Sequence, residues 1–171
     1  LNGFKTHVPK LFQTCVGALS QAPVVLFEGS CTTYLELYHQ SILLATDLGA
    51  CKEEVVGMCA DKSIEEVAAI VGILLAGASY VPLGSKFPLR RLQYLCDTCL
   101  ATKVVATRSH ESLARQISLS IPVIVPNSLN REIRLGSSVP VDWTDSACCY
   151  VLFTSGSTGQ PKGVEVPHGS L

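Results

Sequence analysis

A ten-residue stretch near the C-terminal end of the sequence has the residue types of a phosphate-binding loop. Between Thr154 and Gly163 stand four hydroxyl residues, three glycines and one lysine. Glycines let the backbone approach a ligand closely, and consecutive exposed backbone N–H groups can bind an anion. The hydroxyl groups add short hydrogen-bond donors, and Lys162 adds a mobile positive charge suited to phosphate oxygens. The composition of this stretch therefore predicts phosphate binding.

The stretch differs from two common catalytic loops. A P-loop of the form GxxxxGK[ST], counted from Gly156, needs glycine at position 161 and serine or threonine at 163, but proline and glycine stand there. The GxSxG turn of serine hydrolases is excluded because Ser157 directly follows Gly156. A plain Ser/Gly turn joining two strands is the alternative for residues 156–159 alone. The proline, lysine and glycine that come next, with strands predicted on both sides, favour a ligand-binding loop.

The longer run Tyr-Val-Leu-Phe-Thr-Ser-Gly-Ser-Thr-Gly-Gln-Pro-Lys-Gly-Val, residues 150–164, resembles the AMP-binding signature of adenylate-forming enzymes. These enzymes include acyl-CoA synthetases, luciferases and the adenylation domains of nonribosomal peptide synthetases. In the family, this loop holds the β- and γ-phosphates of ATP while a carboxylate attacks the α-phosphate. The resemblance implies that seven residues contact the ATP phosphates: Thr154, Ser155, Gly156, Ser157, Thr158, Gly159 and Lys162.

Two other stretches resemble core motifs of the peptide-synthetase branch. Residues 74–83, Leu-Leu-Ala-Gly-Ala-Ser-Tyr-Val-Pro-Leu, are similar to the second core motif, and residues 33–37 are similar to the first. The family pattern continues with Asp and Pro where this sequence has Gly84 and Ser85, a departure that could loosen a structural turn. The resemblance identifies the chain as the N-terminal part of an amino-acid adenylation domain, with the fold of an adenylate-forming enzyme.

For the parent protein, the resemblance implies formation of aminoacyl-AMP and pyrophosphate from ATP and an amino acid, with magnesium. The aminoacyl group would then pass to the phosphopantetheine thiol of a peptidyl carrier domain. Lys162 and the loop would offset negative charge as pyrophosphate leaves. The family's adenine and ribose contacts, amino-acid pocket, magnesium-binding acid and catalytic lysine would lie beyond Leu171. We therefore expect residues 1–171 to be one partial adenylation domain, truncated after the phosphate-binding loop and inactive alone.

Two alternatives stay open. The first is a fragment of an acyl-CoA synthetase, which residues 76–82 disfavour. The second is a noncatalytic nucleotide-binding or scaffold module, in which the loop is only a turn.

The elements that must position the loop alternate between helix and strand patterns. Such alternation predicts an α/β fold with a mainly parallel sheet flanked by helices, in which ligands bind beyond the carboxyl ends of strands. The loop follows a predicted strand, residues 147–153, and precedes another, 164–166. We expect helices at 8–19, 34–48, 64–76, 88–100 and 109–119, strands at 24–27, 31–33, 55–59, 79–83, 103–107 and 122–125, and a connector at 127–143. The strand at 24–27 reads as buried, and capping boxes start the helices at 34 and 64.

Composition restricts the classes of partner. The chain has 171 residues, 47% hydrophobic and 16% charged, with a net charge of −1, so we expect one globular domain that binds neither nucleic acid nor a membrane surface. Residues 67–81 are uncharged and mostly apolar, but a span needs about 20 such residues, and a buried helix leading into a buried strand fits better. No signal peptide is visible, and we expect a cytoplasmic protein.

Cysteine and histidine side chains do not suggest a second site. The eight cysteines are expected to be free thiols, with Cys96 and Cys99 on the apolar face of a helix, and we expect no metal site. Because no Ser or Cys nucleophile with an Asp partner can be assigned to them, we expect the four histidines to be noncatalytic: His7, His39, His110 and His168.

Overall fold

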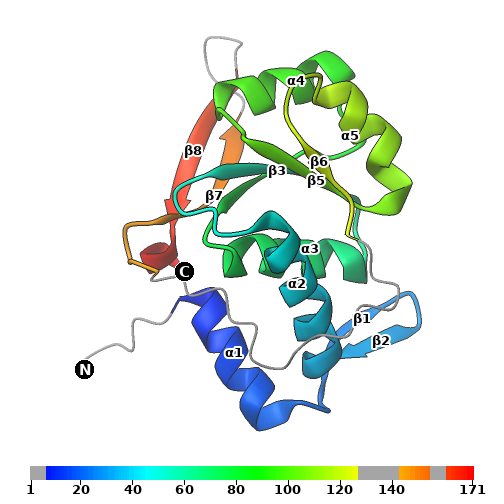
Figure 1. The fold of residues 1–171 in the computed structure, drawn as a ribbon, viewed down its shortest axis with the longest axis vertical. Coiled ribbons are helices and arrows are strands. Elements are labelled where there is room, and N and C mark those ends of the chain that lie inside the picture. Colours follow the sequence, from blue (N-terminus) through cyan, green and yellow to red (C-terminus); the bar gives the residue numbers. More distant parts are fainter. Residues whose placement is uncertain (1–6, 127–142, 155–160) are drawn as a thin grey trace.

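The computed structural model describes residues 7–126, 143–154 and 161–171. A central sheet lies between two layers of helices (Figure 1), which confirms the predicted mainly parallel α/β fold. The elements, in chain order, are α1 (Val8–Leu19), β1 (Pro23–Phe27), β2 (Ser30–Thr33), α2 (Tyr34–Leu48), β3 (Val55–Cys59), α3 (Ile64–Leu75), β4 (Ser79–Pro82), α4 (Leu89–Thr98), β5 (Lys103–Ala106), η1 (Arg108–His110), α5 (Glu111–Ile117), β6 (Val123–Ile124), β7 (Cys148–Thr154), β8 (Lys162–Pro167) and η2 (His168–Ser170).

The central sheet has six strands in the order β6-β5-β3-β4-β7-β8. The pairs β3–β4, β3–β5, β5–β6 and β4–β7 are parallel, and only β7–β8 is antiparallel. Consequently the carboxyl ends of β3, β4, β5, β6 and β7 all reach the same edge of the sheet. In open sheets of this kind that edge is where ligands bind.

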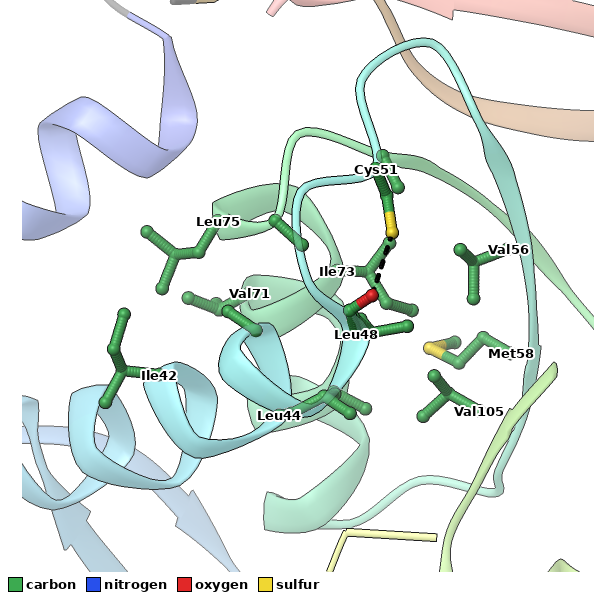
Figure 2. Close-up of a cluster of buried hydrophobic side chains, with 14 residues drawn as sticks. Ile42, Leu44, Leu48, Cys51, Val56, Met58, Val71, Ile73, Leu75 and Val105 are labelled. Carbon is green, nitrogen blue, oxygen red and sulfur yellow. Dashed lines mark hydrogen bonds between the residues drawn. The ribbon is translucent and has the colours of Figure 1, made fainter. Parts of the chain in front are cut away.

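Strand side chains alternate between the two helical layers. On β5, Val104 packs in a cluster with α4 and α5, whereas Val105 packs in a cluster with α2 and α3. This period of two follows from the pleat, and it explains why the central strands are apolar at almost every position. Figure 2 shows the α2–α3 cluster, in which Leu44, Ile73 and Met58 converge from two helices and one strand. Full burial of each such side chain contributes about 2 kcal/mol.

Helix α2 begins at the capping box that the sequence predicts. The Thr33 backbone N–H donates to Glu36 Oε2 at 2.8 Å, and the Glu36 N–H donates to Thr33 Oγ1 at 3.3 Å. The hydrogen bonds from Thr33 also hold the pKa of Glu36 below its usual value. The helix ends at Gly49, whose φ of 73° is a conformation that favours glycine.

The strand predicted at 24–27 is only partly as expected. It pairs with β2 across a turn at Glu28 and Gly29, but it is not a buried strand of the main sheet. The two strands form a separate hairpin, and Leu26 is 76% exposed. A short apolar run does not reveal how many of its faces are covered, and this hairpin has only one layer, α2 and α3, beside it.

Other boundaries shift by a few residues. The helix predicted at 109–119 is shorter, because η1 occupies its first turn and α5 ends at Ile117, and the strand predicted at 122–125 narrows to β6. The predicted connector lies outside the described residues except for Trp143. Residues 67–81 form most of α3 and the start of β4, as expected. Within the described residues, no helix has both the length and the apolar character needed to cross a membrane.

The contact between α2 and α3 depends on a glycine. A Cβ atom on Gly72 would lie 2.8 Å from the Ser41 carbonyl oxygen and 2.9 Å from Leu44 Cδ2. We therefore expect Gly72→Ala to lower the free energy of unfolding by about 1–2 kcal/mol, because overpacking outweighs the helix preference of alanine. Chemical denaturation would measure the loss.

The matched control is Gly17→Ala on α1, where a Cβ atom would meet nothing within 4 Å. Here the higher helix propensity of alanine should raise the free energy of unfolding by about 0.5–1 kcal/mol. Equal effects of the two substitutions would contradict the close packing of α2 on α3.

Candidate functional site

The two ends of the predicted phosphate loop lie side by side on the β7–β8 hairpin. Strand β7 ends at Thr154, β8 begins at Lys162, and these two residues are paired in the antiparallel register. Directly opposite residues have Cβ atoms about 5 Å apart. Both side chains are exposed. The structure therefore brings together a hydroxyl group and an ammonium group at the loop end of the hairpin.

The remaining predicted phosphate contacts lie outside the described residues: Ser155, Gly156, Ser157, Thr158 and Gly159. The described residues on either side of them are Thr154, which ends β7, and Pro161, which precedes β8. Because β7 runs parallel to β4, Thr154 stands at the same edge of the sheet as the carboxyl ends of β3, β4 and β5. This is the position that the sequence predicts.

Close packing restricts the backbone of the hairpin next to the loop. A Cβ atom on Gly163 would lie 3.3 Å from both Phe153 Cζ and Val151 Cγ1, so a glycine fits this position best. Directly before β8, the Pro161 carbonyl oxygen lies 3.5 Å from the Tyr94 hydroxyl of α4, at the outer limit of a hydrogen bond. The backbone that leads into Lys162 is thus held against both β7 and α4.

A cavity of about 540 Å³ opens at the same edge, beyond the ends of β3 and β5. Helix α3 follows β3 on one face of the sheet, and α5 follows β5 on the other, so these strands flank a topological switch point (Figure 1). Crevices at such points are the usual ligand sites of open α/β sheets. The polar residues that line the cavity include Gln40, Asp61, Lys62, Ser63, Glu65, Thr107, Arg108, Ser109 and His110.

A hydrogen-bonded cluster stands at the mouth of this cavity. The Ser85 hydroxyl lies 2.8 and 2.7 Å from the two carboxylate oxygens of Asp61, and His110 Nε2 lies 3.3 Å from Asp61 Oδ2. The other ring nitrogen of His110 lies 2.7 Å from Thr107 Oγ1 and 3.0 Å from Ser109 Oγ. The Ser85 hydrogen bond and, to a lesser extent, the nearby His110 hold the pKa of Asp61 below its usual value.

Comparison with known proteins identifies the family. Residues 12–171 match the family of AMP-binding enzymes. This chain belongs to that family. The match confirms the resemblance to adenylate-forming enzymes.

The curated relatives of this chain are larger proteins. Zwittermicin A synthase ZmaJ of Bacillus cereus is 36% identical over 169 residues, covering 97% of this chain and 32% of the relative. Tyrocidine synthase 3 of Brevibacillus parabrevis is 34% identical over 168 residues, covering 95% of this chain but 3% of the relative. The chain thus spans a third or less of the length of these relatives, and their names agree with the predicted peptide-synthetase branch.

Solved structures have the same fold. IdnL7 matches with a TM-score of 0.79 and 27% identity, covering 97% of this chain and 36% of that one. The nonribosomal peptide synthetase FmoA3, solved with α-methyl-L-serine-AMP bound, matches with a TM-score of 0.82 and 24% identity, covering 95% of this chain and 18% of that one.

The Asp61 cluster was not predicted from the sequence, where His110 is expected only to be noncatalytic. A signal was present. Asp61 follows the end of β3, and His110 follows the end of β5, and the carboxyl ends of neighbouring parallel strands meet at one edge. The departure from the family pattern at Ser85 does not leave a free side chain, because its hydroxyl binds Asp61.

His168 follows the signature in the sequence, and it lies at the opposite end of the hairpin from the loop. It follows β8, six residues after Lys162, which is roughly 20 Å along a strand. His168 is 5% exposed, and its ring meets that of His7 edge-on with centroids 5.6 Å apart. Its Nδ1 atom is buried without a hydrogen-bond partner, and burial, followed by the electrostatic interaction with His7, lowers the pKa of His168.

No candidate metal centre appears in the described ranges, where no three His, Cys, Asp or Glu side chains come together. Cys96 is buried and Cys99 is half-buried, and both pack beside α4 and α5. Burial raises the pKa of the Cys96 thiol to about 12. Cys96 therefore belongs to the apolar core, and Cys99 packs against it, as the sequence indicates.

The burial of His168 makes stability depend on pH. Its pKa is lower in the folded state than the usual 6.5, so below that pH the unfolded chain binds the additional proton more readily. We expect the free energy of unfolding to fall as the pH falls below about 6.5, and His168→Phe to flatten that slope. Denaturation at a series of pH values is the measurement. His39→Phe on α2 controls for the loss of a histidine as such, and an unchanged slope in His168→Phe would contradict the assignment.

Proposed function

We propose that this chain is part of an amino-acid adenylation domain in a nonribosomal peptide synthetase. The parent would convert ATP and an amino acid to aminoacyl-AMP and pyrophosphate, and then load a peptidyl carrier domain. The observation that carries the proposal is the pairing of Thr154 with Lys162 at the carboxyl edge of the sheet, in a chain of the AMP-binding enzyme family. The names of the relatives support the peptide-synthetase branch.

The role proposed for the hairpin is electrostatic. The β- and γ-phosphates would lie over its loop end, where Thr154 offers a hydroxyl donor and Lys162 an exposed ammonium group. The loop residues Ser155, Gly156, Ser157, Thr158 and Gly159 would add hydroxyl and backbone donors. Donors fixed by the β7–β8 ladder need little reorganisation as negative charge develops on departing pyrophosphate. Thus the hairpin positions and neutralises the leaving group, without itself being a nucleophile or base.

The other parts of the reaction are proposed to lie in the rest of the parent. By resemblance to the family, the magnesium ion that accompanies ATP would be held by an acid elsewhere in the parent. The amino-acid pocket and the contacts to adenine and ribose are likewise assigned to the rest of the parent, as is docking of the carrier domain with its phosphopantetheine thiol. Residues 1–171 would then be one partial domain with the phosphate-binding hairpin at its C-terminal side.

The proposed role of Lys162 can be tested in the full-length parent. We expect Lys162→Ala to weaken ATP binding at least tenfold, because it removes a positive charge beside the phosphates, and Lys162→Arg to lose less. Titration calorimetry would measure the binding constant. Lys10→Ala, at an exposed lysine of α1, is the matched control. Unchanged binding in Lys162→Ala would favour a scaffold module in which the loop is only a turn.

A second test separates this piece from the parent. We expect the purified 171-residue chain to show no ATP–pyrophosphate exchange with any amino acid, because the amino-acid pocket is proposed to lie outside it. Radiolabelled pyrophosphate incorporation into ATP is the measurement, with the full-length parent as the positive control. Robust exchange by the 171-residue chain would place the whole active site within it and overturn the domain assignment.

A further inference from the structure

A cysteine and a lysine meet at the amino ends of β3 and β5, away from the proposed ATP site. Cys51 lies in the connection between α2 and β3, and Lys103 is the first residue of β5. Lys103 Nζ is 3.3 Å from Cys51 Sγ. The two residues are 52 positions apart in the chain, so the contact depends on the tertiary fold.

The sulfur atom is held in place by its surroundings. Cys51 is fully buried in the α2–α3 cluster, and its thiol donates to the Leu48 carbonyl oxygen at 3.3 Å. Figure 2 shows this hydrogen bond and the apolar side chains around it. On its other side the sulfur accepts a hydrogen bond from Lys103 Nζ, whose side chain is 22% exposed. The buried sulfur is therefore hydrogen-bonded to a side chain that is itself partly exposed to solvent.

The nitrogen atom is equally constrained. Lys103 Nζ donates to Glu54 Oε2 at 2.6 Å, and the same carboxylate oxygen accepts from Thr102 Oγ1 at 2.5 Å. The parallel register pairs Lys103 with Val56, which fixes its backbone beside the residues that precede β3. The nitrogen thus lies between a thiol and a carboxylate.

We propose that Cys51 and Lys103 form a redox modification site, at which a hydroperoxide links the sulfur and nitrogen atoms through a single oxygen atom. The thiol would first be oxidised by one hydrogen peroxide to a sulfenic acid, with release of water. A second hydrogen peroxide would convert the neutral amine to a hydroxylamine, again with release of water. The hydroxylamine and the sulfenic acid then condense.

The condensation forms the S–O–N bridge and releases a third water. Overall, one thiol, one amine and two hydrogen peroxide molecules give the bridge and three water molecules. Sulfur and nitrogen are oxidised, and the peroxide oxygen is reduced. A bridge through one oxygen leaves sulfur and nitrogen two bonds apart, which is closer to the present separation than a direct S–N bond would be. The ammonium group donates to Glu54 Oε2, and it must lose its proton to a base in solution before the amine reacts.

The protonation state of Lys103 determines how fast the bridge forms. The hydrogen bond with Glu54 raises the pKa of Lys103, and the hydrogen bond from Lys103 lowers the pKa of Glu54. Both shifts oppose loss of the proton from nitrogen. Formation of the bridge should therefore be slow at neutral pH and faster in alkaline solution, in which the amine is neutral more often. No other cysteine in the described ranges donates to or accepts from a lysine, so the reaction should be selective for Cys51.

The test uses the reduced 171-residue chain, exposed to hydrogen peroxide and digested with a protease that does not cleave at lysine. We expect one cross-linked peptide pair containing Cys51 and Lys103, heavier than the sum of the two peptides by about 14 Da, for one oxygen gained and two hydrogens lost. A thiol reductant should restore the separate peptides, because the sulfur is at a reversible oxidation level. Oxidation of Cys51 to sulfinic acid with Lys103 unmodified would overturn the proposal, as would a cross-link with the mass of a disulfide.

Substitutions separate the bridge from other oxidation. Lys103→Arg keeps a cation beside Glu54 but lacks the amine, and Cys51→Ser lacks the sulfur, so neither should give the cross-linked pair. Cys31→Ser changes an exposed cysteine and should give the same yield as the unaltered chain. Circular dichroism confirms that each variant is folded, and the conservative Lys103→Arg keeps the test decisive if Cys51→Ser unfolds. An undiminished yield in folded Lys103→Arg would overturn the proposal.

Discussion

The parallel pairing of β3 with β4 and β5 is the constraint on which the rest of the structure depends. These strands are covered on both faces, by α2 and α3 on one side and by α4 and α5 on the other. Burial on two faces fixes the register, because a slip of one residue would exchange the side chains of the two layers. The register in turn decides which residues meet at each edge. The carboxyl edge gathers Asp61, His110 and the start of the phosphate loop, although they are far apart in the chain.

Local chemistry explains why much of the fold could be predicted from the sequence. The start of α2 depends on Thr33 and Glu36, whose mutual hydrogen bonds need only a spacing of three residues. Its end depends on Gly49, which has the positive φ that glycine tolerates. The strands of the central sheet were visible as apolar runs. The prediction that residues 24–27 form a buried strand was wrong for a non-local reason. The exposure of β1, including Leu26, depends on which elements pack over it, and a run of four apolar residues does not indicate that.

The candidate site likewise has one part that a local sequence pattern predicts and one part that depends on the tertiary fold. The predicted phosphate loop is one contiguous stretch, so a single motif search can propose it from the sequence, and the structure adds that Thr154 is paired with Lys162. The cluster of Asp61, Ser85 and His110 joins three separate segments, so no local sequence pattern predicts it. Only a comparison of the residues that come directly after each parallel strand could have found it. At Ser85 the residue that departs from the family pattern supplies the hydroxyl group that binds Asp61, so a local difference is compensated by a non-local contact.

The two edges of one strand pair carry different chemistry for a common reason. Pairing of Val56 with Lys103 sets β3 against β5, and this register places an ammonium group beside Cys51 at the amino edge and an aspartate beside His110 at the carboxyl edge. The carboxyl edge opens into a cavity lined by polar side chains and suits ligands that come and go. At the amino edge the sulfur is buried and hydrogen-bonded to the partly exposed Lys103, which suits a slow covalent change. A substitution that shifts this register would disturb both edges together, whereas a change at either edge would leave the other in place.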